Sequence, residues 1–379
     1  MAVDSDPLTI FLAGGGTGGH LYPGLAIARA LVALDPSVKP LFVGARRGIE
    51  RDVLPSAGFP HELLELHPLY RSQIWNNWKT LRGAAQAWGR LGAIARAVRP
   101  AAVVGTGGYA SGIALAYAAT HGIPLCLQEQ NSHPGLTTRV FSRFAREVYL
   151  GYPEAAQLLP KKGAVYVDTG NPIQPPPALR PERAAARQAW GFPREGGAVL
   201  LVYGGSQGSR AMNQVVDAWV KRGIPDGLYL IWATGKGTYD EFAGRDGASG
   251  GRVRVRAYLS PIADAYAASD FAVTRAGAMT TAELFAWGIP PVLVPLPTAA
   301  ADHQTANAVT LERAGAAVHL PQRSFTVDHL DAEVRELLVT PERLRAMAAA
   351  GTARARPDAA WEIAARVLAL ARASAGSRQ

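Results

Sequence analysis

The sequence has 379 residues, enough for two domains of ordinary size, and its hydrophobic fraction of 48% is typical of a globular protein with a sizeable core. The formal net charge of +9 favours an anionic partner, such as nucleic acid, an acidic membrane surface or a phosphorylated substrate. The single cysteine, Cys126, excludes an internal disulfide, and no cluster of His and Cys residues has the spacing of a metal site.

Two segments could be mistaken for export or membrane signals. The N-terminal MAVDSDP is acidic and the apolar run after it is short, which is unlike a signal peptide. The charge-free run 101–128 contains five glycines, Pro124 and His121. It therefore predicts a strand, a loop, a helix and a second strand, and not a membrane span.

The stretch 8–20, LTIFLAGGGTGGH, predicts a buried strand, a tight glycine loop and the start of a helix. Glycines let the backbone approach a ligand closely, and the free N–H groups at a helix start favour an anion such as a phosphate. His20 is the one titratable side chain of this loop. The alternative is the strand–helix turn of any α/β protein.

Strands and helices alternate through the first half, which predicts a parallel sheet covered on both faces. Residues 46–51 predict a charged loop. Glu129 and Asn131 follow the end of a strand, where α/β proteins bind ligands, and are candidates for ligand contacts; a loop cap is the alternative. The expected strands are 39–44, 61–67, the start of 100–112, 124–128, 146–151 and 164–169, and the expected helices are 113–120 and 137–144.

The segment 66–128 contains no Asp or Glu. Its first part carries an apolar stripe at helical spacing, which predicts a helix packed on the sheet with solvated arginines. Tryptophans and an isoleucine at a helix start, beside basic residues, also suit the interface of an anionic membrane. The expected membrane residues are Ile74, Trp75, Trp78, Arg71, Lys79 and Arg82.

The proline-rich tract 170–181 interrupts the alternation and predicts a domain boundary. The second half restarts with a strand at 198–203, a glycine loop at 204–209 and a helix at 210–220. Further strands are expected at 228–234, 253–258, 271–274 and 291–294, with a short helix at 263–269 between them. We expect domains at 1–173 and 174–358, and a C-terminal helix and tail at 359–379 that packs back on the first domain.

Two Rossmann-like domains with parallel sheets, facing each other across a cleft, are the simplest architecture for two such halves. Neither glycine loop is followed by Lys-Ser or Lys-Thr, which excludes a P-loop NTPase. The spacing of Gly14, Gly16 and Gly19 fits a dinucleotide fold, but the second strand ends in Gly-Ala-Arg at 44–46 and not in the acid that binds a ribose. A dehydrogenase is therefore disfavoured.

The ordered set of loops closely resembles the MurG family, the peripheral membrane glycosyltransferases of peptidoglycan synthesis, which have the GT-B fold. The matching motifs are GGTGGH at 15–20, GGYASG at 107–112, EQN at 129–131, TGNP at 169–172, GGSQG at 204–208, R-x-G-A-x-T-x-x-E at 275–283 and HQTANA at 303–308. Each glycine loop is common, but the ordered set, which spans about 8–315, is highly specific.

The resemblance implies transfer of N-acetylglucosamine, with inversion, from UDP-GlcNAc to the C4 hydroxyl of the muramic acid sugar of lipid I, which gives lipid II. It also implies a peripheral enzyme at the cytoplasmic face of the bacterial inner membrane, whose surface is anionic. No cofactor and no nucleic-acid partner are implied.

By the same resemblance, His20 is the catalytic base, and an ordinary histidine pKa of about 6.5 suits proton abstraction at neutral pH. Glu283, in the first turn of a predicted helix, would accept hydrogen bonds from both ribose hydroxyls; a charge at a helix N-terminus is the alternative. The other implied donor-binding residues are Thr17, Gly18, Gly19, Asn131, Gln174, Ser206, Leu259, Ala278, Met279, Thr280, His303 and Gln304. The resemblance also implies site residues that contact the acceptor or have another role in the site: Gly15, Gly16, Tyr109, Glu129, Gly205, Gln207 and Arg275.

Two positions depart from the family pattern. Gln174 stands where the family usually has an arginine near the diphosphate, a charge that Arg210 could replace, and Gln128 stands where the family often has a histidine. The only D-x-D motif is in the N-terminal tail, at 4–6, so no metal is expected in catalysis.

Two other functions remain open at this point. Another GT-B enzyme, such as a diacylglycerol glycosyltransferase, would share the Glu283 region but should lack the EQN and HQTANA motifs. A non-catalytic scaffold would bind UDP-GlcNAc and yet release no UDP in the presence of lipid I.

Overall fold

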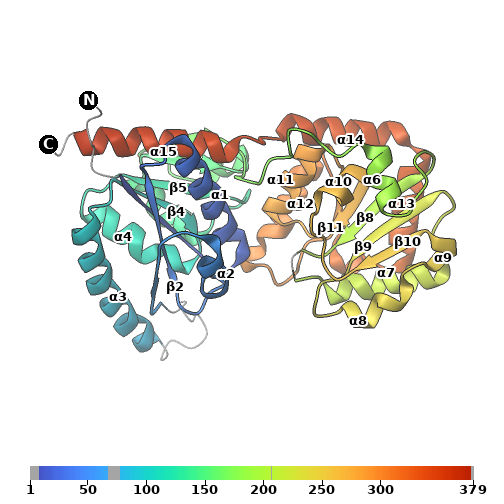
Figure 1. The fold of residues 1–379 in the computed structure, drawn as a ribbon, viewed down its shortest axis with the longest axis horizontal. Helices are drawn as coiled ribbons and strands as arrows, with labels where there is room; N and C mark the ends of the chain where they lie inside the picture. The colour runs from blue at the N-terminus through green and yellow to red at the C-terminus, as the bar shows by residue number, and fades with distance from the viewer. Residues whose placement is uncertain (1–7, 67–76, 206, 377–379) are drawn as a thin grey trace. The chain divides into compact units, whose positions relative to one another are not determined.

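The computed structural model describes residues 8–66, 77–205 and 207–376, and of residues 77–82 it describes the backbone only. The chain divides into two compact units (Figure 1). Unit 1 comprises Met1–Gln174 and Arg356–Gln379, and unit 2 comprises Pro175–Ala355. The last segment of the sequence therefore belongs to the same unit as the first.

Unit 1 is built on a seven-stranded parallel sheet in the order β3-β2-β1-β4-β5-β6-β7. The central strand β1, Thr9–Gly14, is buried along its whole length, and its side chains alternate between two cores: Phe11 lies in one, and Ile10 and Leu12 lie in the other. This two-sided burial explains the continuous apolar run at 8–13. The other strands are β2 Lys39–Ala45, β3 His61–Leu64, β4 Ala102–Gly107, β5 Leu125–Glu129, β6 Glu147–Leu150 and β7 Val165–Asp168.

Helices cover both faces of this sheet. The C-terminal helix α15, Ala359–Gly376, lies beside α1, Gly18–Leu34, where Ile363 and Val367 are buried in one cluster with Leu31 (Figure 1). The remaining helices of unit 1 are α2 Glu50–Ala57, α3 Asn77–Val98, α4 Gly112–Thr120 and α5 Leu136–Phe141, with 3-10 turns at Tyr109–Ser111, Ser142–Phe144 and Pro153–Leu158. Helix α2 begins inside the segment 46–51, so the expectation of a charged loop over all of that segment is wrong.

Unit 2 has a six-stranded parallel sheet in the order β10-β9-β8-β11-β12-β13. Its largest core side chains, Trp219 and Trp232, are fully buried. The strands are β8 Ala198–Tyr203, β9 Leu228–Ala233, β10 Val253–Arg256, β11 Phe271–Thr274, β12 Pro291–Leu293 and β13 Val318–His319. The two-residue strand β13 has no counterpart in the sequence prediction, because so short a run gives no periodicity.

The helices of unit 2 flank its sheet (Figure 1). They are α6 Arg183–Ala189, α7 Arg210–Arg222, α8 Tyr239–Phe242, α9 Ala248–Gly251, α10 Ala263–Ala268, α11 Ala278–Trp287, α12 His303–Arg313, α13 Val327–Val339 and α14 Pro341–Arg354. Short 3-10 turns occur at Ala243–Arg245, Ala300–Asp302 and Gln322–Ser324. Within the described ranges, no helix has a stretch long and apolar enough to cross a membrane.

Strand order brings the sequence motifs of each unit together. In unit 1, β1 and β4 are neighbours, so the glycine loops that follow them meet at the same edge of the sheet. In unit 2, β8 and β11 are neighbours, and the glycine loop after β8 lies beside the segment that begins at Arg275. In both units the chain reverses its direction of travel across the sheet at this pair of strands, the place where open α/β sheets bind ligands.

Candidate active site

A buried carboxylate holds the first glycine loop in place. The N–H of Gly16 donates to Oε2 of Glu50 at 2.9 Å, and the N–H of Ala45 donates to Oε1 at 3.2 Å. Glu50 is fully buried. A Cβ at Gly15 would lie 1.8 Å from Oε1 of Glu50, so only glycine fits there. The N–H of Gly16, which precedes the helix, therefore has an internal acceptor.

His20 lies in the first turn of α1, three residues after the N-cap residue Thr17. Thr17 Oγ1 and His20 Nδ1 are 3.1 Å apart, and the hydroxyl of Thr106 donates to the carbonyl of His20 at 2.7 Å. The ring lies against Gly107, where a Cβ would come within 2.8 Å of Cδ2. Contacts on the ring and on the backbone therefore fix the orientation of His20. Gly18 and Gly19 occupy the same first turn.

The two glycine loops of unit 1 pack directly on each other. A Cβ at Gly108 would lie 2.2 Å from the carbonyl oxygen of Gly15, and one at Gly16 would lie 3.0 Å from the ring of Tyr109. Gly108 also has a φ of 77°, a conformation that favours glycine. The structure thus brings Gly15, Gly16 and Tyr109 together around His20.

Glu129 caps a loop. Its Oε1 accepts from the N–H of Asn131 at 3.1 Å, and its Oε2 accepts from the N–H of Gly135 at 3.0 Å. The carboxylate is buried, and both of its oxygens have backbone partners. Glu129 therefore has the geometry of a loop cap, which the sequence analysis kept as an alternative. The cap positions Asn131, which is half-buried.

A buried amide network lies beside that loop. Nε2 of Gln128 donates to Oδ1 of Asn171 at 3.1 Å, and Nδ2 of Asn171 donates to the carbonyl of Gln130 at 3.0 Å. Nε2 of Gln130 in turn donates to the carbonyl of Thr106 at 2.8 Å. Gln128 is therefore part of the scaffold beneath the site. Gln174, the last residue of unit 1 before the break, is exposed.

Arg275 fastens the parts of the unit 2 site to one another. Its Nη1 donates to the carbonyls of Val294 and Pro295 at 3.1 and 3.0 Å. Its Nη2 donates to Oγ of Ser209 and Oε1 of Gln322, both at 2.7 Å. Burial lowers the pKa of Arg275 to about 10, so the guanidinium stays charged at neutral pH. The side chain therefore ties the start of α7 to the end of β12.

The glycine loop next to Arg275 connects β8 to α7. Gly205 is half-buried in it and Gln207 is exposed, whereas Ser206 lies outside the described residues. Ser209 is the N-cap of α7 and accepts from the N–H of Met212. Arg210, the sequence candidate for a diphosphate contact, pairs instead with Glu241 at 2.6 Å on the exposed surface.

A chain of buried hydroxyls holds Glu283. The hydroxyl of Tyr266 donates to Oε2 of Glu283 at 2.8 Å, and the hydroxyls of Tyr203 and Tyr266 are 3.0 Å apart. Burial raises the pKa of Glu283, and the hydrogen bond from Tyr266 opposes that rise. Burial also raises the pKa of both tyrosines, which therefore remain hydrogen-bond donors at neutral pH.

Glu283 is the sixth residue of α11, so the expectation that it lies in the first turn is wrong, and a charge effect at the helix N-terminus does not explain it. The first turn contains Ala278, Met279 and Thr280. Leu259 follows β10 and is buried.

The last motif begins α12. Oε1 of Gln304 accepts from the N–H of Leu296 at 2.9 Å, which fixes the loop after β12. Nδ1 of His303 donates to the carbonyl of Ala300 at 2.8 Å. Both side chains are half-buried, and both are oriented by backbone contacts.

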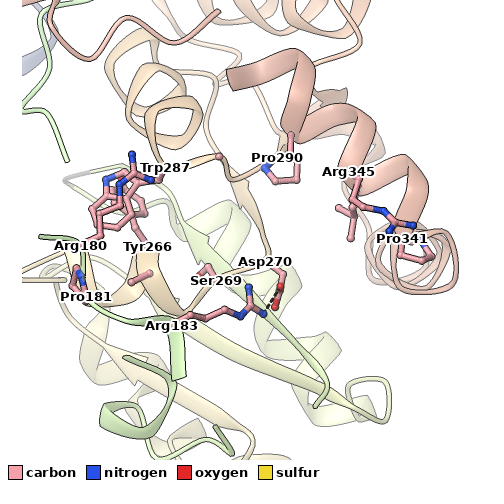
Figure 2. A pocket seen from close by; sticks show the side chains of 14 residues that line it. Arg180, Pro181, Arg183, Tyr266, Ser269, Asp270, Trp287, Pro290, Pro341 and Arg345 are labelled. Atoms are coloured by element: carbon pink, nitrogen blue, oxygen red, sulfur yellow. Dashed lines mark hydrogen bonds and ion pairs between the residues drawn. The ribbon is translucent and has the colours of Figure 1, made fainter. Parts of the chain in front are cut away.

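A separate hollow of about 460 Å³ lies on unit 2 (Figure 2). Arg180 stacks over Trp287 at 5.3 Å on one side, and Arg183 pairs with Asp270 on the other. Tyr266 also lines it, but no site residue predicted from the sequence does. This hollow is therefore not the place where the sequence motifs converge.

Several predicted positions cannot be placed. Arg71, Ile74 and Trp75 lie outside the described residues, and Trp78, Lys79 and Arg82 lie in α3 where only the backbone is described. Among the residues that the structure does describe, no group of His, Cys, Asp and Glu could hold a metal ion.

Sequence reasoning missed four site residues: Glu50, Thr106, Tyr203 and Tyr266. Only Glu50 left a signal in the sequence, since this acid follows the second strand and comes two residues after the second of two closely spaced glycines, at 44 and 48. The three hydroxyls lie on or near strands and helices where apolar and small residues dominate, and their roles depend on contacts between distant segments.

Comparison with known proteins places the chain among glycosyltransferases. Residues 10–150 match the glycosyltransferase family 28 N-terminal domain, and residues 199–363 match the family 28 C-terminal domain. A curated protein of Salinibacter ruber, named as the UDP-N-acetylglucosamine–N-acetylmuramyl-(pentapeptide) pyrophosphoryl-undecaprenol N-acetylglucosamine transferase, is 42% identical over 96% of both chains. The protein of the same name from Moorella thermoacetica is 41% identical over 93% of this chain and 96% of its own.

The crystal structure of Acinetobacter baumannii MurG is similar as well. It has a TM-score of 0.75 and 25% identity, and the match covers 96% of this chain and 99% of the other. The chain has two α/β units with parallel sheets, and its structure is similar to that of MurG. It therefore has the GT-B fold. The chain therefore belongs to glycosyltransferase family 28 and, within it, to the MurG family.

Proposed function

We propose that His20 is the base of an inverting sugar transfer in this member of the MurG family. The chain is an N-acetylglucosamine transferase that uses UDP-GlcNAc as donor and lipid I as acceptor, and its product is lipid II. The observation that supports the role of His20 is its fixed place between the two glycine loops of unit 1, at the sheet edge where such folds bind ligands.

The reaction needs one proton acceptor. As the C4 hydroxyl of the muramic acid sugar attacks C1 of N-acetylglucosamine, the bond from C1 to the diphosphate breaks, UDP leaves, and the hydroxyl proton must go to a base. If Nδ1 of His20 carries a proton and donates it to Thr17 Oγ1, Nε2 is the ring nitrogen that accepts. The Thr17 hydroxyl can accept from Nδ1 or donate to it, so the proposed role of Nε2 as base requires the tautomer in which Nδ1 carries the proton.

The nucleotide part of the donor is assigned to unit 2. Glu283 accepts hydrogen bonds from the two ribose hydroxyls, and the N–H groups of the first turn of α11 and the backbone of Leu259 bind the uracil and the sugar. The N-terminus of α7 and the preceding glycine loop stabilise the negative charge that grows on the leaving diphosphate. Asn131, Gln304 and His303 are the candidates for contacts with sugar hydroxyls.

Membrane docking is a further part of the proposal. A lipid-linked acceptor requires contact with the cytoplasmic face of the inner membrane, and the acid-free segment 66–128 supplies basic and aromatic residues suited to an anionic surface. Vesicle co-sedimentation of the triple Arg71/Lys79/Arg82→Ser variant tests this. We expect weaker binding than wild type on anionic vesicles at low salt; equal sedimentation of the two proteins would refute the assignment.

The decisive test of the function is UDP release by the purified protein. With UDP-GlcNAc, we expect release with lipid I and none with diacylglycerol or with simple glycolipids as acceptors. Release with the simple lipids alone would indicate a different GT-B enzyme. UDP-GlcNAc binding without release under any of these conditions would indicate a non-catalytic protein.

A further inference from the structure

We propose that Glu50 is a positioning residue for catalysis: its carboxylate serves as the built-in anion of the first glycine loop and thereby fixes His20. The inference rests on the proposed role of His20 as base. It assigns a function to a residue that none of the sequence motifs contains.

The first observation is how completely the loop is built around this carboxylate. Glu50 is fully buried, and it accepts from the N–H of Gly16 at 2.9 Å and from the N–H of Ala45 at 3.2 Å. A Cβ at Gly15 or at Gly48 would lie 1.8 or 1.9 Å from a carboxylate oxygen. Two glycines from different segments therefore make room for one side chain.

The second observation is the charge balance. Of the three nearby arginines, Arg46 pairs with Glu65 at 3.3 Å and Arg51 pairs with Asp52 at 2.9 Å, and among the residues that the structure describes no ion pair joins Arg47 to Glu50. Within the described ranges, no Lys or Arg forms an ion pair with Glu50, and its carboxylate accepts from the backbone N–H groups of Gly16 and Ala45. Burial of a carboxylate without a cation costs desolvation free energy, so an apolar residue such as leucine would anchor α2 at a lower cost in free energy. Anchoring the helix therefore does not explain the choice of Glu.

The third observation is the path to the reacting atoms. The N–H of Gly16 donates to Glu50, and Gly16 immediately precedes Thr17. Oγ1 of Thr17 is in turn 3.1 Å from Nδ1 of His20. The carbonyl of Gly15 packs against Gly108, which in turn lies against the His20 ring. A shift of the loop at residues 15–16 therefore moves both surfaces that orient the imidazole.

A corollary concerns the donor. In dinucleotide folds the corresponding glycine loop donates its N–H groups to a pyrophosphate. Here an internal carboxylate takes the Gly16 N–H, and a second anion beside it would be repelled. The diphosphate of the donor is thus excluded from the Gly16 position, and Glu50 should affect turnover without affecting UDP affinity.

The test compares Glu50→Ala and Glu50→Gln with Glu147→Gln as a matched control. Glu147 is a partly buried carboxylate of the same unit, paired with Arg366 at 3.5 Å at the start of β6 and so at the opposite edge of the sheet. We expect kcat to fall by about tenfold to a hundredfold in both Glu50 variants, the range for a small misplacement of a catalytic group. UDP affinity, measured by calorimetry, should stay within about twofold of wild type in all three variants.

Chemical rescue separates positioning from a loss of fold. Formate should enter the space left in Glu50→Ala, accept from the Gly16 N–H and restore part of the lost kcat, whereas formamide, which is neutral and of similar shape, should not. Full turnover in a folded Glu50 variant would overturn the proposal, and so would a loss that formate leaves unchanged. If Glu50→Ala does not fold, Glu50→Gln decides alone, because an unchanged kcat there contradicts the need for a carboxylate.

A double-variant cycle distinguishes this inference from the role of His20. If Glu50 acts through His20, the change Glu50→Ala should cost little more in a His20→Ala background, since the base is already absent. If His20→Ala by itself keeps full turnover, the proposed base is wrong whatever Glu50 does. If the two losses multiply, Glu50 acts by another route and the positioning role fails.

Discussion

The change Tyr266→Phe tests the hydroxyl chain behind Glu283. It removes one oxygen atom, which donates to Glu283 Oε2 at 2.8 Å and lies 3.0 Å from the Tyr203 hydroxyl. The ring remains, and with it the packing on Trp287 at 5.6 Å. The loss should therefore be electrostatic, and it should appear first in the affinity for UDP, whose ribose Glu283 is proposed to hold.

The size of the effect follows from the bond that is lost. A hydrogen bond to a charged group contributes about 1.5–3 kcal/mol, which corresponds to roughly a tenfold to hundredfold change in an equilibrium constant. Part of this is recovered because the freed carboxylate binds the ribose with fewer competing contacts, so we expect a loss in UDP affinity near the lower end, about tenfold. The fold is also weakened by about 1 kcal/mol, since the buried Tyr203 hydroxyl loses a partner and keeps Thr280 as its polar neighbour.

The same change should alter the pH dependence of binding. Ribose hydroxyls donate to the ionised carboxylate, so UDP affinity falls as the pH drops through the pKa of Glu283. Burial already raises this pKa above its ordinary value, and the Tyr266 hydrogen bond holds it down. Without that bond the pKa rises further, and the loss of affinity on acidification should begin at a higher pH in Tyr266→Phe than in wild type.

Isothermal titration of UDP across a range of pH measures both effects. Tyr229→Phe is the matched control, because Tyr229 lies in the same unit and packs against Phe192 at 5.0 Å, far in sequence from Glu283. Equal UDP affinity and an equal pH profile for Tyr266→Phe and wild type would refute the argument, and would show that the hydroxyl chain serves the fold alone.

Three further results are expected. His20→Ala should lower turnover at saturating lipid I by roughly a hundredfold or more while UDP-GlcNAc binding is kept, and an unchanged rate of UDP release would eliminate His20 as base. Arg275→Lys should reduce the free energy of unfolding in urea by about 2 kcal/mol or more, because an ammonium cannot reach the four acceptors that the guanidinium bridges; an unchanged midpoint would contradict this. Burial raises the pKa of the Cys126 thiol to about 12, so iodoacetamide at pH 8 should label the unfolded protein readily and the native protein hardly at all, and rapid native labelling would refute that burial.

The arrangement of the sheets could be predicted because local patterns determine it. Continuous apolar runs such as 10–13 and 199–202 are buried on both faces, and the alternation with helices requires a parallel sheet. The charge-free segment 101–128 is β4, α4 and β5, as its glycines and proline predicted. Once the strand order is known, the places where the glycine loops meet follow from topology.

What the sequence could not reveal depends on contacts between distant segments. Glu50 looks like one charge among the arginines of 46–51, yet it is fully buried because a loop 34 residues away supplies an N–H. Tyr266 lies in a six-residue helix that gives a weak pattern, and its link to Glu283 crosses to a different helix. The motifs identified Glu129 and Glu283 as candidates, but not their local structure. Glu129 caps a loop through two backbone N–H groups, and Glu283 lies in the second turn of α11.

The placement of α15 has a consequence for the order in which the protein matures. Ile363, Val367 and Leu368 are buried in the core that contains Leu25 and Leu31, and full burial of three such side chains contributes roughly 5–9 kcal/mol. That is comparable with the whole net stability of an ordinary domain, about 5–15 kcal/mol. A ribosome makes the sheet of unit 1 first but delivers this covering helix only after all of unit 2 has been synthesised. The nascent first half therefore exposes this apolar face during synthesis, and the unit that carries His20 acquires its full core only when translation is almost complete.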